Sequence, residues 1–277
     1  ALIRTRATIQ EINCVRKHLS AIKGGRLAAA AYPARVLTLA ISDVAGDDPS
    51  VIASGPTVGD ATTQADARAI LTKYRVPVTP AVERTLSDAA FESIKPSDAR
   101  VAASDVRIVA RGADALATAC NEAHRLGFET RILGTDIQGD ARAMALAHAE
   151  IARDAKTAPR PLVLLSGGEL TLDVSGTGHG GPNREYLLAL AAALQGTEGI
   201  WALAADTDGI DGSDDVAGAW IGPDTLSRAE RLGLDARQCA QDNNSGKFFA
   251  DLGQSVVTGP TRTNVNDFRA VLVQPSV

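Results

Sequence analysis

Aromatic side chains make up only 4% of this chain, so its interior cannot depend on large rings. Alanine and glycine are abundant instead, and small residues allow helices to approach a sheet closely. Hydrophobic residues fill 45% of the 277 positions, which is enough for one large domain or two ordinary domains with buried cores. The composition therefore predicts an α/β protein.

Cysteine is nearly absent. Cys14, Cys120 and Cys239 stand far apart in the sequence, and no CxxC spacing occurs. An odd number of isolated cysteines argues against a disulfide framework and against a zinc site. We expect the protein to work in a reducing cytoplasm.

The sequence also has no apolar run of membrane-spanning length, no signal-peptide pattern and no Lys/Arg-rich run. With a net charge of −5, these features argue against nucleic acid or an anionic membrane as a partner. A small substrate, an anionic one included, is the partner that we expect. The oligomeric state stays open, a homodimer included.

Two common catalytic patterns are missing: the G-x-S-x-G elbow of serine hydrolases and the G-x-x-x-x-G-K-[ST] phosphate loop. His179 is the only histidine in a glycine-rich loop, while His18, His124 and His148 fall on helical patterns. Carboxylates with cation-assisted phosphate chemistry fit the sequence better than a histidine-centred mechanism.

Apolar periodicity predicts alternating strands and helices in the first part of the chain. This alternation predicts a Rossmann-like, mainly parallel sheet with flanking helices. The expected helices are 9–21, 64–74, 81–91, 114–126 and 141–155, and the expected strands are 35–41, 106–110 and 130–133.

The linker-like TAPRP at 157–161 predicts a domain boundary, with domains at 1–157 and 158–277. Alternation in LTLDVSG predicts a half-exposed antiparallel strand, so the second domain should be α/β with a mixed sheet. Its expected strands are 161–168, 170–176, 199–205, 255–258 and 268–273, and its expected helices are 182–194, 225–232 and 247–252.

Polar loops follow three of the predicted strands. They are Ser42-Asp43, then Ser166, Gly167, Gly168 and Glu169, and finally Asp206, Thr207, Asp208 and Gly209. In open α/β sheets, ligands bind at the carboxyl ends of the strands. We therefore expect these loops to contribute to a binding site.

The stretch AADTDGIDGSDDVAGA, residues 204–219, has an unusual density of carboxylates. Like charges at this spacing repel unless a cation, a bound hydroxyl or backbone donors compensate. An acidic surface turn is the alternative interpretation. The position of the stretch after a buried strand favours a functional role.

Glycine-rich loops provide further candidates. GTGHGG, residues 176–181, matches G-x-G-x-x-G and leads into a helix, which is typical of dinucleotide binding. Ser54-Gly55 in SGPT and Ser166 to Glu169 in SGGE could approach an anion, or could be tight turns. Lys17, near Gly24, could meet a substrate carboxylate or lie on a solvated helix face.

Five motifs together resemble one family: INCVRKHLSAIKGGRLA, ISDVAGDDPSVIASGPTVGD, LLSGGELTL, GGPNREYLLALAAAL and AADTDGIDGSDDVAGA. Their order and spacing, over nearly the whole chain, resemble the class II glycerate 2-kinases of tartrate utilisation, also called hydroxypyruvate reductases. In that family the later motifs belong to the MOFRL domain. The resemblance implies that residues 1–157 are the latter part of a larger Rossmann-like domain.

The resemblance implies a cytoplasmic transferase that moves the γ-phosphoryl group of ATP to the 2-hydroxyl of D-glycerate, with Mg²⁺ as cofactor. Asp206, Asp208 and Asp211 would hold the metal, and Asp206 or Asp208 would accept the hydroxyl proton. Arg184 and Asn183, with the glycine loops, would bind phosphate. A salt bridge from Arg184 to Glu185 or to a neighbouring loop acid is the alternative interpretation of this arginine.

Two departures from the family pattern leave alternatives open. The family has a further N-terminal segment with a lysine, so we expect this chain to be the larger part of such an enzyme. Many members read GGRNxE where this chain has Pro182, so its guanidinium would come from Arg184. The alternatives are an NAD(P)H-dependent hydroxypyruvate reductase and an inactive ligand-binding fragment.

Overall fold

The computed structural model describes residues 1–275 and divides into two compact units, Ala1–Val109 and Ala110–Val277. The α/β class and the mixed sheet predicted from the sequence are confirmed. The boundary lies earlier than the expected one at residue 157, because residues 129–134 pair with strand 162–168 and helix 141–155 packs in the second unit.

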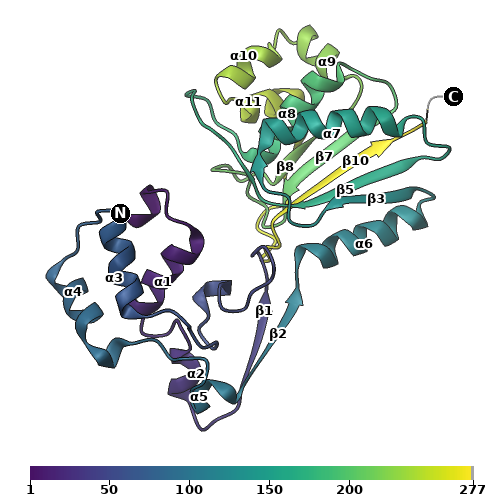
Figure 1. The fold of residues 1–277 in the computed structure, drawn as a ribbon. Helices are drawn as coiled ribbons and strands as arrows, with labels where there is room; N and C mark the ends of the chain where they lie inside the picture. Colours follow the sequence, from purple (N-terminus) through teal and green to yellow (C-terminus); the bar gives the residue numbers. More distant parts are fainter. Residues whose placement is uncertain (276–277) are drawn as a thin grey trace. The chain divides into compact units, whose positions relative to one another are not determined.

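The first unit is mainly helical (Figure 1). Capping boxes at Thr8 with Glu11 and at Thr63 with Asp66 begin its first and third helices. Its elements are η1 (Leu2–Arg4), α1 (Ile9–Leu19), α2 (Arg26–Ala31), β1 (Val36–Ile41), η2 (Ile52–Ser54), α3 (Gln64–Lys73), α4 (Pro80–Ser87), η3 (Ala89–Phe91), α5 (Ala99–Ala102) and β2 (Ser104–Ala110).

A small core holds η1, α1, α3 and α4 together. It contains Leu2, Cys14, Val15, Ala67, Leu71 and Leu86. The strands β1 and β2 lie outside this core, and among the described residues each pairs with no strand but the other. Leu37, Leu39 and Ile41 of β1 remain exposed, as does Val109 of β2.

The second unit is built on a six-stranded sheet in the order β3-β5-β10-β7-β8-β9. β3 and β5 are parallel, and the other neighbours are antiparallel. Its elements are α6 (Gly112–Arg125), β3 (Glu129–Gly134), β4 (Gly139–Asp140), α7 (Ala141–Ala155), β5 (Leu162–Gly168), β6 (Leu170–Thr171), α8 (Pro182–Leu194), β7 (Ile200–Asp206), β8 (Gly218–Ile221), α9 (Thr225–Arg231), α10 (Ala236–Gln241), α11 (Ser245–Leu252), β9 (Ser255–Val256) and β10 (Asp267–Val273).

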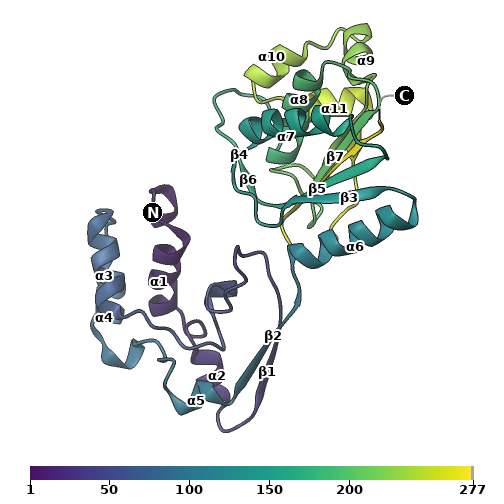
Figure 2. The ribbon, with the colours of Figure 1, turned by 45° about the vertical axis from the view of Figure 1, so that its right-hand side comes forward.

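Helices cover the two faces of this sheet unequally (Figure 2). α7 and α8 pack on one face over a large alanine- and leucine-rich core, whereas α6 covers β3, β5 and β10 on the other. Over β7 and β8 that second face carries Trp201 and Trp220, which are 37% and 36% exposed. Among the described residues, no helix is long and apolar enough to cross a membrane.

Two predicted elements are shorter than expected. The helix predicted over 81–91 ends at Ser87, and Ala89–Phe91 forms a separate 3-10 turn. The strand predicted over 170–176 is limited to Leu170–Thr171, because the chain then turns toward Asn243. The Asn243 Oδ1 atom accepts a hydrogen bond from the Ser175 N–H at 2.9 Å.

Candidate functional site

Sheet register brings three polar strand ends together in the second unit. Asp267, at the start of β10, lies opposite Gly168 at the end of β5 and opposite Asp206 at the end of β7. The loops predicted to follow these two strands therefore share one edge. This is the edge at which α/β sheets bind ligands.

Asp206 and Asp208 form a carboxylate pair at this edge. The Asp208 N–H donates to Asp206 Oδ1 at 2.9 Å, and Asp208 Oδ1 accepts from the Ile210 N–H at 2.7 Å. Partial burial raises the pKa of Asp206 to about 7, and the nearby charges of Asp208 and Asp267 act in the same direction. A carboxyl in this setting either holds a proton near neutral pH or needs a cation.

Two residues of this edge, Asp267 and Arg269, were not predicted from the sequence. Arg269 Nη1 pairs with Asp267 Oδ2 at 2.8 Å, and its other nitrogens donate to Ser166 Oγ at 3.2 Å and Gly167 O at 2.8 Å. Both side chains are buried. The sequence does contain a sign of them, because Asp267 and Arg269 are two charged residues at alternate positions of an otherwise apolar strand.

Asn183 joins the same network from the first turn of α8. Its Nδ2 donates to Asp267 Oδ1 at 2.6 Å. Its Oδ1 is buried and has no hydrogen-bond partner within the described part of the chain. Asn183 thus links α8 to β10 behind the carboxylate pair.

The SGGE loop is shaped by the protein itself. A Cβ on Gly168, whose φ is +106°, would lie 2.2 Å from the Ile137 nitrogen, and one on Gly167 would lie 2.9 Å from the Thr135 oxygen. The Ile137 N–H donates to Gly167 O at 3.0 Å. These glycines therefore admit the backbone of residues 135–137, while Glu169 is exposed.

Thr207 and Gly209 hold the turn after β7 in place. Thr207 Oγ1 donates to Asn266 O at 2.7 Å and accepts from the Val265 N–H at 2.9 Å. Gly209 has φ +96°, and a Cβ there would lie 2.3 Å from Gly259 O. Both residues position the carboxylate pair by anchoring the turn that carries it.

Arg184 forms a salt bridge to loop acids, which was the alternative to phosphate binding, and Asp211 is one of its two partners. Arg184 is 1% exposed, and its Nε lies 2.9 Å from Asp211 Oδ2 while Nη1 lies 2.7 Å from Asp214 Oδ2. Asp211 also accepts from the Asn183 and Arg184 N–H groups at 3.0 and 3.1 Å. The anion at this helix N-terminus is therefore a carboxylate of the protein.

Because Asp211 is bound to Arg184 and to the start of α8, it does not join Asp206 and Asp208 as the third metal ligand that the resemblance implied. Its carboxylate is committed to Arg184 and α8, and in the part of the chain that the structure describes no three His, Cys, Asp or Glu side chains converge as a metal site. Of the three expected metal ligands, Asp206 and Asp208 are the two that lie together.

The GTGHGG loop contacts the connection between α10 and α11. The N–H groups of Ser175 and Gly176 donate to Asn243 Oδ1, both at 2.9 Å, and the Gly178 N–H donates to Asp242 O at 2.8 Å. A Cβ on Gly178 would lie 2.4 Å from the Asn244 Cβ. The glycine spacing is thus required by packing within the unit.

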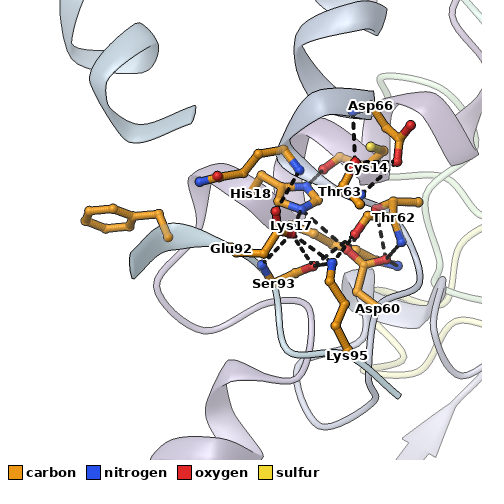
Figure 3. A network of polar contacts seen from close by, with 12 residues as sticks. Cys14, Lys17, His18, Asp60, Thr62, Thr63, Asp66, Glu92, Ser93 and Lys95 are labelled. Carbon is orange, nitrogen blue, oxygen red and sulfur yellow. Dashed lines mark hydrogen bonds and ion pairs between the residues drawn. The ribbon is translucent and has the colours of Figure 1, made fainter. Parts of the chain in front are cut away.

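In the first unit, Lys17 is buried in a polar network (Figure 3). Its Nζ lies 3.2 Å from Asp60 Oδ1, and Asp60 also accepts from the Thr62 hydroxyl. The neighbouring His18 lies 2.9 Å from Glu92 Oε1. Lys17 therefore joins α1 to the loop at Asp60 and does not lie on a solvated helix face, which was one of the two interpretations of this residue.

The SGPT loop pairs with the glycines that follow α1. The Gly24 N–H donates to Ser54 O at 3.1 Å, and the Gly25 N–H donates to Gly55 O at 2.9 Å. Ser54 Oγ donates to Asn13 Oδ1 at 2.9 Å. These contacts explain Ser54 and Gly55 as structural residues, whereas Asp43 is exposed.

Fold and site together define a two-unit α/β protein with a carboxylate pair at one sheet edge of its second unit. The chain matches two family models: the domain of unknown function DUF4147 over residues 1–87 and the MOFRL family over residues 162–267.

Known proteins resemble it over nearly its whole length. A putative hydroxypyruvate reductase of Agrobacterium vitis is 48% identical over 99% of this chain, and the D-glycerate 2-kinase of Thermotoga maritima is 37% identical over 96%. The crystal structure of the Thermotoga maritima glycerate kinase superposes with a TM-score of 0.88 at 36% identity, covering 98% of this chain.

The chain belongs to the MOFRL-containing family of glycerate 2-kinases and putative hydroxypyruvate reductases, which confirms the resemblance. It spans 71% of the Agrobacterium vitis relative, 63% of the Thermotoga maritima enzyme and 65% of the solved chain.

Proposed function

We propose that this chain provides the acidic residues of a glycerate 2-kinase site, at which the γ-phosphoryl group of ATP is transferred to the 2-hydroxyl of D-glycerate. The observation that carries the proposal is the Asp206–Asp208 pair at the sheet edge. A partly buried carboxylate pair is suited to bind a cation and to accept a proton.

The pair fits Mg²⁺ because this ion is usually held by one or two protein carboxylates, with phosphate and water oxygens completing its shell. The raised pKa of Asp206 reflects burial and negative charge that a cation would offset. When bound, Mg²⁺ would neutralise charge on the nucleotide phosphates.

The proton of the substrate has a defined destination in this proposal. The 2-hydroxyl oxygen bonds to the γ-phosphorus while the bond from that phosphorus to the β,γ-bridging oxygen breaks, and ADP leaves with the electron pair. The hydroxyl proton passes to the Asp206–Asp208 pair.

Asp267, Arg269 and Asn183 are positioning residues in this scheme. They fix the end of β5 and the start of β10 beside Asp206 through buried hydrogen bonds. Glu169 and Asp43 are exposed and remain candidates for substrate contact. Ser166, Gly167 and Gly168 act by shaping the edge.

Hydroxypyruvate reduction is the second candidate, favoured by the name of the Agrobacterium vitis relative. A reductase would need a nicotinamide dinucleotide site, and the sequence offered GTGHGG for it. The N–H groups of that loop donate hydrogen bonds to Asn243 and Asp242, so they are not available to bind a dinucleotide phosphate. This arrangement favours the kinase over the reductase. We further propose a cytoplasmic location, since all three cysteines are free thiols.

The two candidates are separated by parallel assays. The protein is incubated with ATP, Mg²⁺ and D-glycerate while 2-phosphoglycerate is followed by phosphorus NMR, and with NADH and hydroxypyruvate while NADH absorbance is followed. We expect phosphoglycerate in the first assay and constant NADH in the second. Loss of NADH without phosphoglycerate would contradict the kinase proposal.

A further inference from the structure

Asn183 has a buried oxygen without a partner. The side chain is 1% exposed, and its Nδ2 donates to Asp267 Oδ1 at 2.6 Å. A carboxylate accepts hydrogen bonds and cannot donate them, so the amide nitrogen has to face Asp267 and the amide oxygen has to point elsewhere. Among the described residues, no donor reaches this Oδ1 atom. In native proteins a water, an ion or a functional role usually explains such an atom.

The sheet places this amide beside the Asp206–Asp208 pair. Asp267 and Asp206 are register partners on adjacent antiparallel strands, so their side chains lie on the same face with Cβ atoms about 4.5 to 5.5 Å apart. Ala204 and Val271 share this face and belong to the same core as the leucines of α8. The first turn of α8 therefore lies over the strand ends that carry the carboxylates.

The two carboxylates each use one oxygen to fix the turn after β7. Asp206 Oδ1 accepts from the Asp208 N–H at 2.9 Å, and Asp208 Oδ1 accepts from the Ile210 N–H at 2.7 Å. Their Oδ2 atoms have no N–H donor among the described residues. Arg184 and Arg269, the arginines of this region, pair with other carboxylates. The negative charge of the pair is therefore not balanced by these arginines.

These oxygens and their charge suit a hard divalent cation. Mg²⁺, Mn²⁺ and Ca²⁺ bind carboxylate and amide oxygens, whereas softer metals favour nitrogen and sulfur ligands. A water molecule would satisfy the oxygen of Asn183 but would leave the charge of the two carboxylates uncompensated. Asp206 and Asp208 are partly exposed, so an ion can reach them from solvent.

We propose that Asn183 Oδ1 is the third protein ligand of a divalent cation held by Asp206 and Asp208, the place that Asp211 does not fill. Asn183 then has two roles, since its Nδ2 fixes Asp267 while its Oδ1 binds the ion. The inference rests on the proposed function for the identity of the ion as Mg²⁺. The binding itself needs neither nucleotide nor glycerate.

Mn²⁺ binding to the 277-residue chain without nucleotide tests the proposal, with the free ion measured by EPR spectroscopy. Asn183→Leu removes the oxygen and should weaken Mn²⁺ binding at least about tenfold. Asn183→Asp keeps an oxygen at the same place and should bind Mn²⁺ at least as tightly as the unchanged chain. Both variants lose the hydrogen bond from Nδ2 to Asp267, so a role in positioning alone would weaken binding equally in both.

Asn243→Asp is the matched control for the added charge. Asn243 is also a buried asparagine of the second unit, but its Oδ1 already accepts from the Ser175 and Gly176 N–H groups. This variant should bind Mn²⁺ as the unchanged chain does, and Mn²⁺ should raise its melting temperature less than that of Asn183→Asp. Absence of Mn²⁺ binding by the unchanged chain, unchanged binding by Asn183→Leu, or equal weakening in both Asn183 variants would overturn the proposal.

A crystallographic measurement covers the case in which the Asn183 variants do not fold. In crystals of the unchanged chain grown with Mn²⁺, we expect an anomalous peak within about 2.0 to 2.6 Å of Asn183 Oδ1 and of oxygens from Asp206 and Asp208. A peak that contacts the aspartates but not Asn183 would refute the ligand role.

Phosphoglycerate formation by the unchanged chain is measured separately, so that the two proposals fail independently. Mn²⁺ bound through Asn183 without any phosphoglycerate would support the cation site and contradict the kinase. Phosphoglycerate formation together with unchanged Mn²⁺ binding by Asn183→Leu would support the kinase and contradict the role of Asn183 as a ligand.

Discussion

Arg184 is a charged residue that the fold has to keep paired. Its guanidinium is 1% exposed between Asp211 and Asp214, so removing it leaves two carboxylates next to a helix N-terminus without their cation. Breaking a buried ion pair by deleting one partner strongly destabilises a protein. The same residue would matter little for folding if it reached out to a phosphate.

We expect Arg184→Met to lower the free energy of unfolding by about 3 to 5 kcal/mol, measured by urea denaturation. Arg231→Met, at an exposed position at the end of α9, is the control and should change stability little. Unchanged stability together with weaker ATP binding would instead support a phosphate-binding role.

For Asp208 we expect a loss of activity without a loss of stability, the opposite of the result expected for Arg184. Asp208→Asn keeps an acceptor for the Ile210 N–H but removes a negative charge beside Asp206. Phosphoglycerate formation should fall below detection while the melting temperature stays unchanged or rises slightly, because repulsion is relieved. Asp215→Asn, in the same loop but exposed, should retain activity; its inactivation would show that the pair has no special role.

Part of this site could be predicted residue by residue. Asp206 and Asp208 follow an apolar strand, which is a local pattern. Asp267 could not be placed beside them, because its position depends on β10 lying between β5 and β7, and strand order is not encoded locally. For Arg184, a salt bridge to a neighbouring loop acid was an open alternative, but which acid would reach it depends on how the loop folds back onto α8.

At the scale of elements, the predicted bounds of α7 and α8 match the structure. α7 carries apolar residues at helical spacing, whereas α8 is apolar over most of its length and begins with Pro182, a first-turn residue. β8 was not predicted, since GAWI is short and gains its strand geometry from β7. Sequence patterns located elements that bury a long apolar stripe better than those that depend on a neighbour.

The loop before α8 gives an element-scale prediction. Gly178→Ala places a Cβ 2.4 Å from the Asn244 Cβ, so the loop must move away from the α10–α11 connection. We expect a loss of about 1 to 3 kcal/mol in unfolding free energy, measured by urea denaturation. A dinucleotide loop would instead lose NADH affinity with little change in stability.

Gly233→Ala serves as the comparison for that substitution. Its Cβ would meet nothing within 4 Å, and only its φ of +70° opposes a side chain. It should lose about 1 kcal/mol, the backbone strain alone. A loss for Gly178→Ala no greater than this would argue against the packing explanation.

A buried histidine of α7, His148, contacts Tyr186 of α8 and has a lowered pKa. His148 Nδ1 lies 2.9 Å from the Tyr186 hydroxyl, and burial together with the Arg269 charge lowers the pKa of His148 to about 4 from 6.5. Between these values the unfolded chain binds a proton that the folded chain does not. Stability is therefore lost as pH falls from about 6.5 to about 4.

This histidine should contribute a loss of up to about 3 kcal/mol over that range. His148→Asn cannot titrate but can still accept from Tyr186, so its stability should fall less steeply with pH. Urea unfolding of both proteins at a series of pH values measures the difference. Parallel curves for the two proteins would rule out His148 as a titrating group in folding.

At the scale of the whole molecule, the described hydrophobic clusters each lie within one unit. Leu86 belongs to the small cluster of the first unit and Leu190 to the large cluster of the second; both side chains are fully buried. Separate cores predict that a cavity in one unit leaves the other unit's stability unchanged.

Leu86→Ala should lose about 2 to 5 kcal/mol locally, so amides of α1, α3 and α4 exchange faster while those of β5 and β10 do not. Leu190→Ala should produce the reverse pattern. Peptide-resolved hydrogen exchange makes both measurements. Faster exchange throughout the molecule in either variant would contradict separate folding of the two units.

The two tryptophans of the chain, Trp201 and Trp220, both lie on the open face of the second unit's sheet. Intrinsic tryptophan emission is therefore a signal from one unit only. Because each indole is about a third exposed, acrylamide should quench both readily, and a molecule seated over β7 and β8 should shift their emission to the blue. Ligands of the first unit would leave the spectrum unchanged, so fluorescence can assign a binding event to a unit.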